Sequence, residues 1–200
     1  NDASLPDSAN IDVVGGWHDA SDYLQYSTTS ANAAYHLLMA YRDYPKAFSD
    51  FKLANGLDGK NKVPDVLDEA VWGIQWLLKM FPNKNWMFNQ LGDDRDHISM
   101  RIPKLDSQYG KGYERPVYFI DGEKQQQGKG LNHTEGTSST AAKFASVFAL
   151  AASLQHNDST FSRMAAANDF ATKALDAYEY ALKKPGVTQT VSVKAPYIYA

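Results

Sequence analysis

A short segment near the start of the chain combines acidic and aromatic side chains in a pattern that could act on sugars. Asp19 and Asp22 lie three residues apart, and Trp17, His18 and Tyr23 flank them. Sugar rings present apolar faces and a rim of hydroxyl groups, so a sugar site needs flat aromatic side chains and hydrogen-bond acceptors. Two close carboxylates can also hold one water molecule, and their repulsion raises the pKa of one, which suits a general base.

The same residues also fit roles without chemistry, and spacing alone does not decide between the two. An Asp-x-x-Asp pair is typical of a capped turn or a solvated loop. Trp17 taken alone would fit a hydrophobic core, and His18 taken alone would fit a hydrogen-bonded structural role. Gly15 and Gly16, just before them, allow tight backbone geometry in either case.

Apolar side chains recur at helical spacing in two segments that follow this loop. The first predicted helix covers residues 28–43 and stops before Pro45. The second has Pro64 as its first helical residue, because the N–H group that proline lacks would be unpaired there, and Pro82 ends it. The predicted buried residues are Ala31, Ala34, Tyr35, Leu38 and Tyr41 in the first helix, and Val66, Ala70, Ile74, Leu77 and Phe81 in the second.

Two further helices are predicted in the second half of the chain. Residues 138–154 are apolar on nearly all sides, which indicates a deeply buried helix. Asp158 is a good N-cap for a helix that continues to residue 184, where Pro185 and Gly186 end it. The predicted buried face of this last helix holds Phe161, Ala165, Asn168, Ala171, Leu175, Tyr178 and Leu182.

Between the second and third predicted helices lies a long irregular region, residues 83–137. Residues 117–120 could pair as a short strand within it. Structureless connections of this length are uncommon in compact domains unless they carry function. We therefore expect helices that hold up long loops, with the chemistry on the loops.

The composition is that of a globular chain and argues against several partners. Hydrophobic residues make up 44% of the chain and charged residues 22%. A net charge of −3 without a basic stripe argues against nucleic acid as the main partner. The longest apolar stretch, residues 144–154, is too short to cross a bilayer. With no cysteine, neither disulfides nor thiolate metal sites support the fold.

The complete string at residues 15–22 resembles the signature of glycoside hydrolase family 9, which contains cellulases and endoglucanases. That signature reads approximately Gly-Gly-Trp/Tyr-His/Tyr-Asp-Ala-Gly-Asp, and Ser21 is the one departure from it. A serine is tolerated there if the backbone keeps a negative φ, so the departure bears on the pose of Asp22. Five later segments are similar to elements of the family in the same order: residues 63–70, 92–97, 113–116, 137–148 and 195–197.

The resemblance implies an all-α fold, the (α/α)6 barrel of six helical hairpins, of which this chain would be the N-terminal half. Residues 1–200 would then belong to a single catalytic domain, with residues 1–11 as a linker from an upstream module. The family hydrolyses β-1,4-linked glucans with inversion of configuration. One carboxylate takes a proton from water while a carboxylic acid protonates the leaving oxygen.

The resemblance also assigns roles to individual residues. Asp22 matches the general base of the family, and Asp19 matches the residue that helps to hold the attacking water. The general acid is a glutamate near the C-terminal end of the family's domain, which this chain does not match, so the chain alone should not turn over substrate. The glutamates that do not match by motif are Glu69, Glu114, Glu123, Glu135 and Glu179. Glu69 is instead explained as a favourable charge at the start of a helix.

Several residues are candidates for contact with substrate. His97 matches a histidine that contacts sugar in the family, although a structural role beside Asp96 is equally open. Trp17, His18 and Tyr23 are further candidates. Arg115 fits a structural role in which it pins a loop through carboxylates. The remaining aromatics divide into Trp86, Tyr109 and Tyr113, which could stack on sugars, and Trp72 and Trp76, which fit the core.

The resemblance extends to cofactor, partners and location. Related enzymes often carry calcium, but residues 93–96 lack the full calcium-loop pattern, so no metal is predicted in this chain and calcium is left to the second half of the domain. The expected partner is a β-glucan polysaccharide or oligosaccharide. An upstream immunoglobulin-like module and an extracellular or periplasmic location are implied by the resemblance alone, since the chain itself shows no signal peptide.

Two other functions remain open at this stage. The same site could belong to an exo-acting glucosidase or glucosaminidase, or to an enzyme for xyloglucan or mixed-linkage glucan, because the shape of the loops decides this. A protein of another class, a carbohydrate-binding protein with a degenerate site, would have lost one of the motif aspartates or the downstream glutamate. Both aspartates are present.

Overall fold

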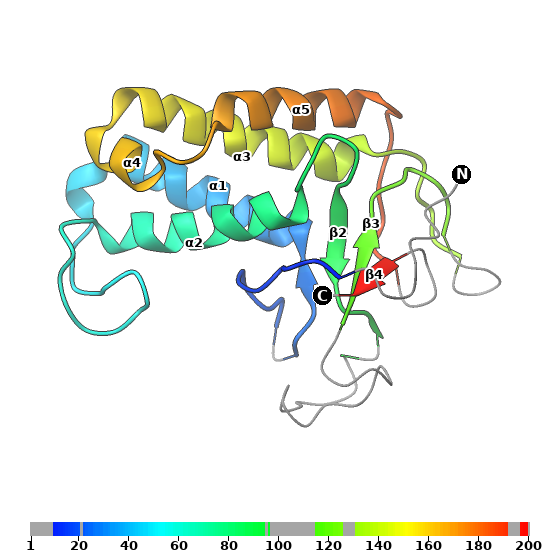
Figure 1. Ribbon diagram of the computed structural model, residues 1–200, viewed down its shortest axis with the longest axis horizontal. Helices are drawn as coiled ribbons and strands as arrows, with labels where there is room; N and C mark the ends of the chain where they lie inside the picture. Colours follow the sequence, from blue (N-terminus) through cyan, green and yellow to red (C-terminus); the bar gives the residue numbers. More distant parts are fainter. Residues whose placement is uncertain are drawn as a thin grey trace.

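Helices make up about half of the part of the chain that the computed structural model describes, which comprises residues 10–20, 22–94, 96, 115–125, 131–191 and 197–199. The helix α1 (Ser27–Asp43) and the helix α2 (Asp65–Met80) lie side by side and run in opposite directions (Figure 1). A short 3-10 turn, η1 (Pro45–Ala47), and the loop of residues 48–64 connect them.

The α1–α2 hairpin forms where the apolar spacing predicts it. Ala31, Ala34 and Leu38 of α1 are fully buried, as the predicted face requires. All the predicted residues of the second helix are buried as well. One detail of the prediction was wrong: Pro64 occupies the N-cap position of α2 rather than its first helical position. Its extended ψ of 134° places it outside the helix, as is usual for an N-cap residue.

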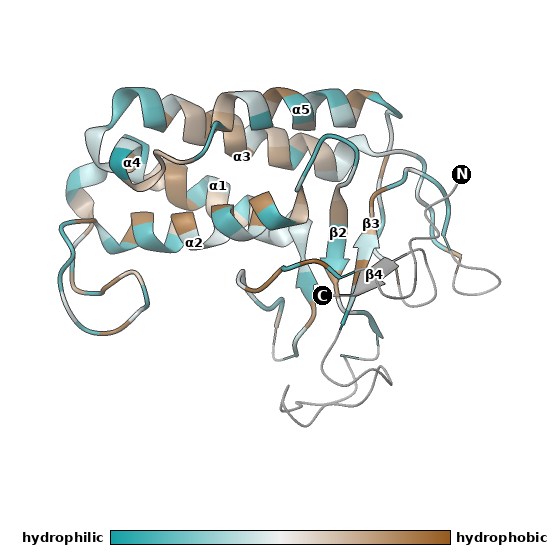
Figure 2. Ribbon diagram, in the orientation of Figure 1, coloured by the Kyte–Doolittle hydropathy of each residue, from teal (hydrophilic) through white to brown (hydrophobic). Residues whose placement is uncertain are grey.

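The helix α3 (Ser138–Asn157) lies between α1 and α5 (Phe170–Leu182), and its apolar residues face both (Figure 2). Phe144 and Phe148 of α3 are fully buried and meet Phe81 and Phe170 in one aromatic cluster. The prediction that α3 is buried on nearly all sides was wrong, because one face is exposed. Within the predicted range 138–154, that face carries only small side chains, which leave little apolar area in contact with water: Ala142, Ser146, Ala149 and Ser153.

The predicted helix 158–184 is two helices, α4 (Ser159–Met164) and α5, separated by residues 165–169. The Asp169 carboxylate accepts hydrogen bonds from the backbone N–H and the hydroxyl of Thr172, so it caps a new helix rather than continuing the old one. The Gln155 amide donates to the carbonyl oxygens of Ala165 and Asn168 at 3.0 and 2.9 Å. These bonds satisfy backbone groups that the break would otherwise leave unpaired.

The break shifts the helical phase, so the buried face predicted for α5 was also wrong. Leu175, Tyr178 and Leu182 are 63%, 55% and 55% exposed. The residues of α5 that are buried instead are Phe170, Ala177, Tyr180 and Ala181.

A small antiparallel sheet lies at one end of the helices (Figure 1). Its strands are β1 (Gln25–Tyr26), β2 (Phe88–Leu91), β3 (Pro116–Phe119) and β4 (Tyr197–Tyr199), in that order across the sheet. The predicted strand at 117–120 is therefore present, one residue earlier. The region expected to be irregular also contributes β2, which pairs with both β1 and β3. Helices still predominate, in agreement with the predicted fold class.

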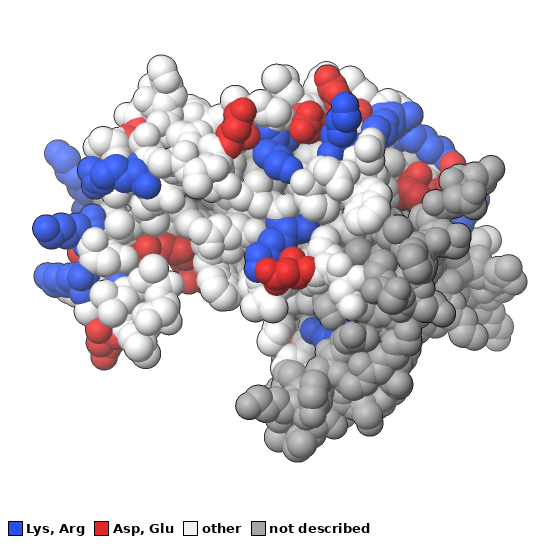
Figure 3. Space-filling view, viewed as in Figure 1, with Lys and Arg blue, Asp and Glu red and all other residues white. Residues whose placement is uncertain are grey.

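Charged side chains of both signs occur on the face shown in Figure 3. Basic residues gather over the loop between α1 and α2, which contains Lys46, Lys52, Lys60 and Lys62. None of the described helices is long and apolar enough to cross a membrane.

Candidate active site

The loop of residues 11–24 packs on α2 through three tryptophan side chains. The indole N–H of Trp17 donates to Glu69 Oε1 at 2.6 Å. The indole N–H groups of Trp72 and Trp76 donate to the carbonyl oxygens of Gly16 and Val13 at 2.9 and 3.1 Å. All three indoles therefore have their polar atom satisfied and their orientation fixed.

Two glycines make this packing possible. Gly16 has φ +70°, and a Cβ atom there would lie 2.6 Å from the Trp76 ring. In the middle of α2, a Cβ atom on Gly73 would lie 2.2 Å from Cη2 of Trp17. Both distances are too short for a side chain, so the Trp17 ring rests directly on the backbone of α2.

Two structural roles on α2 were not recognised in the sequence. Trp72 was expected in the core, but it is 45% exposed, whereas Trp76 is buried as predicted. Glu69 was explained by the helix dipole, and it is also the acceptor for Trp17. The spacing 69, 72, 76 along one side of a helix is the signal that could have revealed both, because such residues line one face.

Asp19 and Asp22 belong to one turn that Leu24 closes. The backbone N–H of Asp19 donates to the carbonyl oxygen of Leu24 at 2.8 Å, and the N–H of Leu24 donates to Asp22 Oδ1 at 2.9 Å. Asp19 is exposed and Asp22 is half-buried. The turn-capping role considered from the sequence is therefore real for Asp22, and it fixes the position of that carboxylate.

Asp19 faces a hollow between the motif loop and the start of α1. The hollow has a volume of about 140 Å³ and is lined by Trp17, His18 and Asp19 of the loop and by Thr29, Ser30 and Ala33 of α1. Three of the predicted site residues are thus brought together around one space. A catalytic role for Asp19 requires such access to solvent and substrate.

Arg115 fixes the other side of the turn, as predicted. Its guanidinium group donates to the carbonyl oxygen of Tyr23 and forms an ion pair with the fully buried Asp96. It also lies over the Tyr23 ring, 5.9 Å from the centroid, and His18 packs edge-on against that ring at 5.1 Å. Arg115 thereby links the start of β3 to the loop that carries Asp22.

The charges around the turn act on two neighbouring side chains. Burial, together with the smaller effect of the nearby carboxylates of Asp19, Asp94 and Asp22, raises the pKa of Tyr26 to about 12. Burial lowers the pKa of His18, the Arg115 cation lowers it too, and Asp22 opposes them. The lowered pKa favours the neutral form of His18, and the carboxylates of Asp19, Asp22 and Asp94 are all close enough to Tyr26 to act on its hydroxyl group.

Some predicted residues are not part of this arrangement. Trp86, one of the candidates for sugar stacking, packs edge-on against Phe88 and Phe119, which is a core role. His97, Tyr109 and Tyr113 lie outside the described residues. No group of three or more acidic, histidine or cysteine side chains in the described ranges is arranged to hold a metal ion.

Comparison with known protein families identifies the family of this chain. A family profile described as "Glycosyl hydrolase family 9" matches residues 1–200. The chain belongs to this family. The motif loop, the turn at Asp19 and Asp22 and the α1–α2 hairpin are therefore family 9 elements.

Two curated relatives each match about a third of the chain. Endoglucanase C of Cellulomonas fimi is 40% identical over 74 residues, which is 35% of this chain and 7% of that protein. A cellodextrinase of Butyrivibrio fibrisolvens is 39% identical over 72 residues, which is 35% of this chain and 13% of that protein. The matched stretch is thus a small share of each relative.

Solved family 9 structures match over most of the chain. A metagenome-derived family 9 endoglucanase superposes with a TM-score of 0.62 and 25% identity, covering 98% of this chain and 32% of that one. A thermostable endoglucanase from Alicyclobacillus acidocaldarius superposes with a TM-score of 0.55 and 22% identity, covering 86% of this chain and 28% of that one. The chain spans about a third of the length of these structures. The likeness agrees with the predicted (α/α)6 barrel, of which the described helices are part.

Proposed function

We propose that this chain is the part of an inverting glycoside hydrolase that activates water for cleavage of β-1,4-glucosidic bonds in cellulose or related β-glucans. Family 9 membership and relatives named as endoglucanases support this assignment. The observation that carries it is the turn in which Asp19 and Asp22 are held together beside Trp17 and His18, with Asp19 open to a hollow.

The proposed mechanism gives each aspartate one task. Asp22 takes a proton from a water molecule, and Asp19 accepts a hydrogen bond from the same water and orients it. The water oxygen forms a bond to the anomeric carbon while the bond from that carbon to the leaving glucosyl oxygen breaks. A carboxylic acid on the opposite side, outside this chain, donates the proton that the leaving oxygen needs. The product has the inverted anomeric configuration.

The local structure supports the difference between the two carboxylates. Asp22 is half-buried and fixed by the N–H of Leu24, so a base at this position would keep one orientation. His18 and Tyr23 pack against each other beside the turn and offer ring edges and faces to a sugar. His97 is proposed as a further substrate contact from its position in the family motif alone.

Hydrolysis of a soluble β-1,4-glucan by the full-length protein tests this function. We expect Asp22→Ala to lower kcat by about a thousandfold or more, because general base catalysis contributes about 10²–10⁴-fold and a fixed water is lost with it. Asp19→Ala should lower kcat less. NMR of the first products should show the α-anomer from a β-linked substrate. Asp43→Ala, which removes an exposed carboxylate paired with Arg42, is the matched control and should leave kcat unchanged. An Asp22→Ala variant as fast as the parent would remove Asp22 from this role.

A second activity is favoured by one relative. The cellodextrinase of Butyrivibrio fibrisolvens is 39% identical over 72 residues of the chain, and its name indicates action on short glucans. An exo-acting enzyme of this kind releases one product size from a defined oligosaccharide, whereas an endoglucanase releases a mixture. Product analysis on a six-unit cello-oligosaccharide separates the two. A non-catalytic carbohydrate-binding protein would show neither product and no effect of Asp22→Ala on binding kinetics.

The remaining parts of the proposal concern the whole protein. We place it outside the cytoplasm, in the extracellular space or periplasm, because its proposed substrate is a polysaccharide too large to enter a cell. An upstream immunoglobulin-like module and a bound calcium ion stay predictions from the family resemblance.

A further inference from the structure

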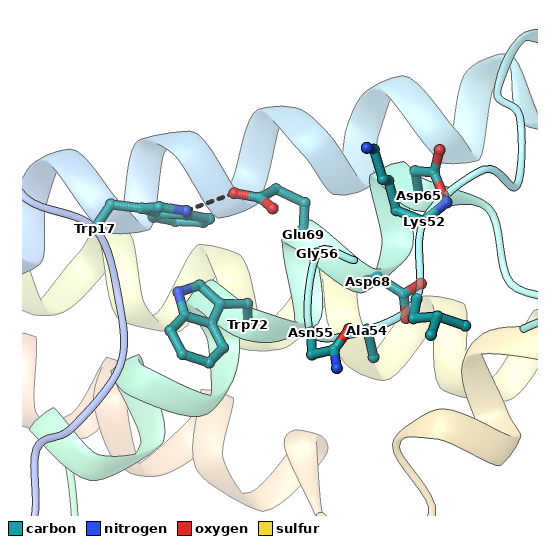
Figure 4. Close-up of a pocket in the computed structure, with 10 residues that line it drawn as sticks. Trp17, Lys52, Ala54, Asn55, Gly56, Asp65, Asp68, Glu69 and Trp72 are labelled. Carbon is teal, nitrogen blue, oxygen red and sulfur yellow. Dashed lines mark hydrogen bonds between the residues drawn. The ribbon is translucent and has the colours of Figure 1, made fainter. Parts of the chain in front are cut away.

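The motif loop is held in place on two sides. On one side the Trp17 indole rests on α2 and donates to Glu69, as Figure 4 shows. On the other side Arg115, just before β3, donates through Nη2 to the carbonyl oxygen of Tyr23. The first contact lies five residues before Asp22, whereas the second lies on the residue that follows it. Arg115 is therefore the support nearer in the chain to the proposed base.

A single peptide group connects Arg115 with Asp22. The carbonyl of Tyr23 and the N–H of Leu24 are the two polar ends of the same planar unit. Arg115 donates to the carbonyl, and the N–H donates to Asp22 Oδ1 at 2.9 Å. Because the unit is rigid, a contact that fixes its C=O group also fixes the direction of its N–H group. The cation polarises the peptide as well, which strengthens the hydrogen bond to Asp22.

The guanidinium group is itself fixed by a buried carboxylate. The same Nη2 atom lies 2.5 Å from Oδ2 of Asp96, whose side chain is fully buried, while the side chain of Arg115 is 17% exposed. Gly92 leaves the room for this ion pair, since a Cβ atom there would lie 2.1 Å from Asp96 Oδ2 and 2.7 Å from Arg115 Nη2. The N–H of Gly92 donates to the carbonyl oxygen of Pro116 at 2.8 Å, so the loop that carries Asp96 is also joined to β3.

Stability alone does not account for this ion pair. Two apolar side chains of similar size often stabilise a fold as well as a buried ion pair does. A lysine would also neutralise Asp96, but its ammonium group is a point charge on a flexible stem. The guanidinium group holds its donors in a fixed plane, so that one of them meets Asp96 while another meets the Tyr23 carbonyl. The second contact lies beside the proposed base.

We propose that Arg115 is a positioning residue for the general base, on which it acts through the peptide group between Tyr23 and Leu24. The inference rests on the proposed function, because it requires Asp22 to be the base. In this role Arg115 touches neither the water nor the sugar. Its loss should therefore slow the step that activates water and leave substrate binding unchanged.

Kinetics of the full-length protein on a soluble β-1,4-glucan test the proposal. The variant Arg115→Met/Asp96→Leu replaces the ion pair by two apolar side chains, so that no unpaired charge is buried. We expect it to lower kcat by about 10- to 100-fold, as is usual when a catalytic group is displaced, and to leave KM within about twofold. Arg115→Lys keeps the charge without the planar donors, and it should lose less kcat than the double variant.

Lys173→Met is the matched control. The ammonium group of Lys173 also donates to two backbone carbonyl oxygens, those of Phe81 and Pro82, and it lies 5.1 Å from the centroid of the Phe81 ring. This cation belongs to another junction, between α5 and the end of α2. Its removal should lower the thermal stability of the protein and leave kcat unchanged.

A second measurement shows whether Arg115 acts through Asp22. Azide is a nucleophile that needs no base, so it can replace the attacking water in an Asp22→Ala protein. Its nitrogen forms a bond to the anomeric carbon of an aryl cellobioside, while the bond to the aryl oxygen breaks and the phenolate leaves without a proton. In the Asp22→Ala background, Arg115→Met/Asp96→Leu should leave the rate of this reaction within about twofold, because the base is already absent.

Two results would overturn the proposal while the proposed function stands. One is a folded Arg115→Met/Asp96→Leu protein with the kcat of the parent. The other is an azide reaction that slows as much as hydrolysis does, because Arg115 would then act on something other than the base. If the double variant does not fold, Arg115→Lys and Asp96→Asn decide, since both must lower kcat at unchanged KM. A full-length parent that does not hydrolyse β-glucan removes the proposed function instead.

Discussion

At the scale of single residues, the motif loop shows how one residue can serve structure and chemistry together. Asp22 caps a turn through Leu24 and is also the proposed base. From the sequence, turn capping and catalysis are alternative roles for the Asp-x-x-Asp pair. The structure makes the two roles compatible, because a carboxylate that caps a turn has a fixed orientation. Fixed orientation is what a catalytic group requires.

The contact between Gly73 and Trp17 gives a prediction at this scale. Alanine at a helical glycine normally stabilises a protein by about 1 kcal/mol. Here the new Cβ would lie 2.2 Å from the Trp17 ring, and overpacking costs about 1–3 kcal/mol. We expect Gly73→Ala to lower the unfolding free energy and to reduce kcat by moving the loop. Urea denaturation measures the first effect. The double variant Gly73→Ala/Trp17→Ala relieves the contact and should lose less stability than the two single changes summed.

Tyr26 gives a prediction for alkaline pH. Its pKa in the folded protein is about 12, above the value of about 10 expected in the unfolded chain. The unfolded chain therefore loses the proton first, and the contribution of Tyr26 to stability is complete below pH 10 and disappears as the pH rises to about 12. In Tyr26→Phe the unfolding free energy should fall less over this window, by about 1 kcal/mol for a half-buried phenol. Tyr178→Phe, at an exposed position, is the control for the removal of a tyrosine hydroxyl group.

At the scale of elements, helical spacing predicted where helices form better than where they stop. The α1–α2 hairpin and α3 were predicted because their apolar residues recur with a period that the chain alone sets. The break between α4 and α5 was missed, since it depends on Asp169 as a second cap and on the Gln155 side chain from another helix. The pairing of β2 with β1 and β3 joins residues far apart in the chain, so no local pattern specifies it.

Asp158 supports a prediction about how α1 and α4 are joined. Its Oδ1 atom accepts from the N–H of Phe161, and its Oδ2 atom accepts from the Tyr41 hydroxyl at 3.0 Å. Asp158→Ala should destabilise the protein by about 2 kcal/mol, because a helix cap and a partly buried hydrogen bond are lost together. Tyr41→Phe should account for part of this loss, and the double variant should cost less than the sum. Glu179→Ala, at an exposed helical position, is the control and should cost little.

At the scale of the whole molecule, the family was predicted from the order of several motifs, while the cavity of about 290 Å³ beside α2 was not. This cavity needs Trp17 from the motif loop, Trp72 from α2 and Ala54 from the connecting loop in one place. Only the folded chain brings these three together. The sequence pattern also placed the wrong face of α5 in the core, and Leu175, Tyr178 and Leu182 are exposed.

The division of catalytic groups gives a prediction at this scale. Inverting hydrolysis needs a base and an acid on opposite sides of the sugar, and only the base has a motif match in this chain. The chain of 200 residues, expressed alone, should therefore not hydrolyse β-glucan, whereas the full-length protein should. Reducing-sugar release from a soluble glucan measures both. Turnover by the 200-residue chain would show that one of its own glutamates acts as the acid.

The three indoles that attach the motif loop to α2 also provide a fluorescence signal for this contact in solution. Trp17, Trp72 and Trp76 are three of the four tryptophans in the chain, so its ultraviolet emission reports chiefly on this one junction. Far-ultraviolet circular dichroism reports on the helices instead. If the loop detaches from α2 before the helices melt, the emission will shift to longer wavelength at a lower temperature than the dichroism changes. The order of the two transitions then tells whether the protein loses its water-activating turn before it loses its fold.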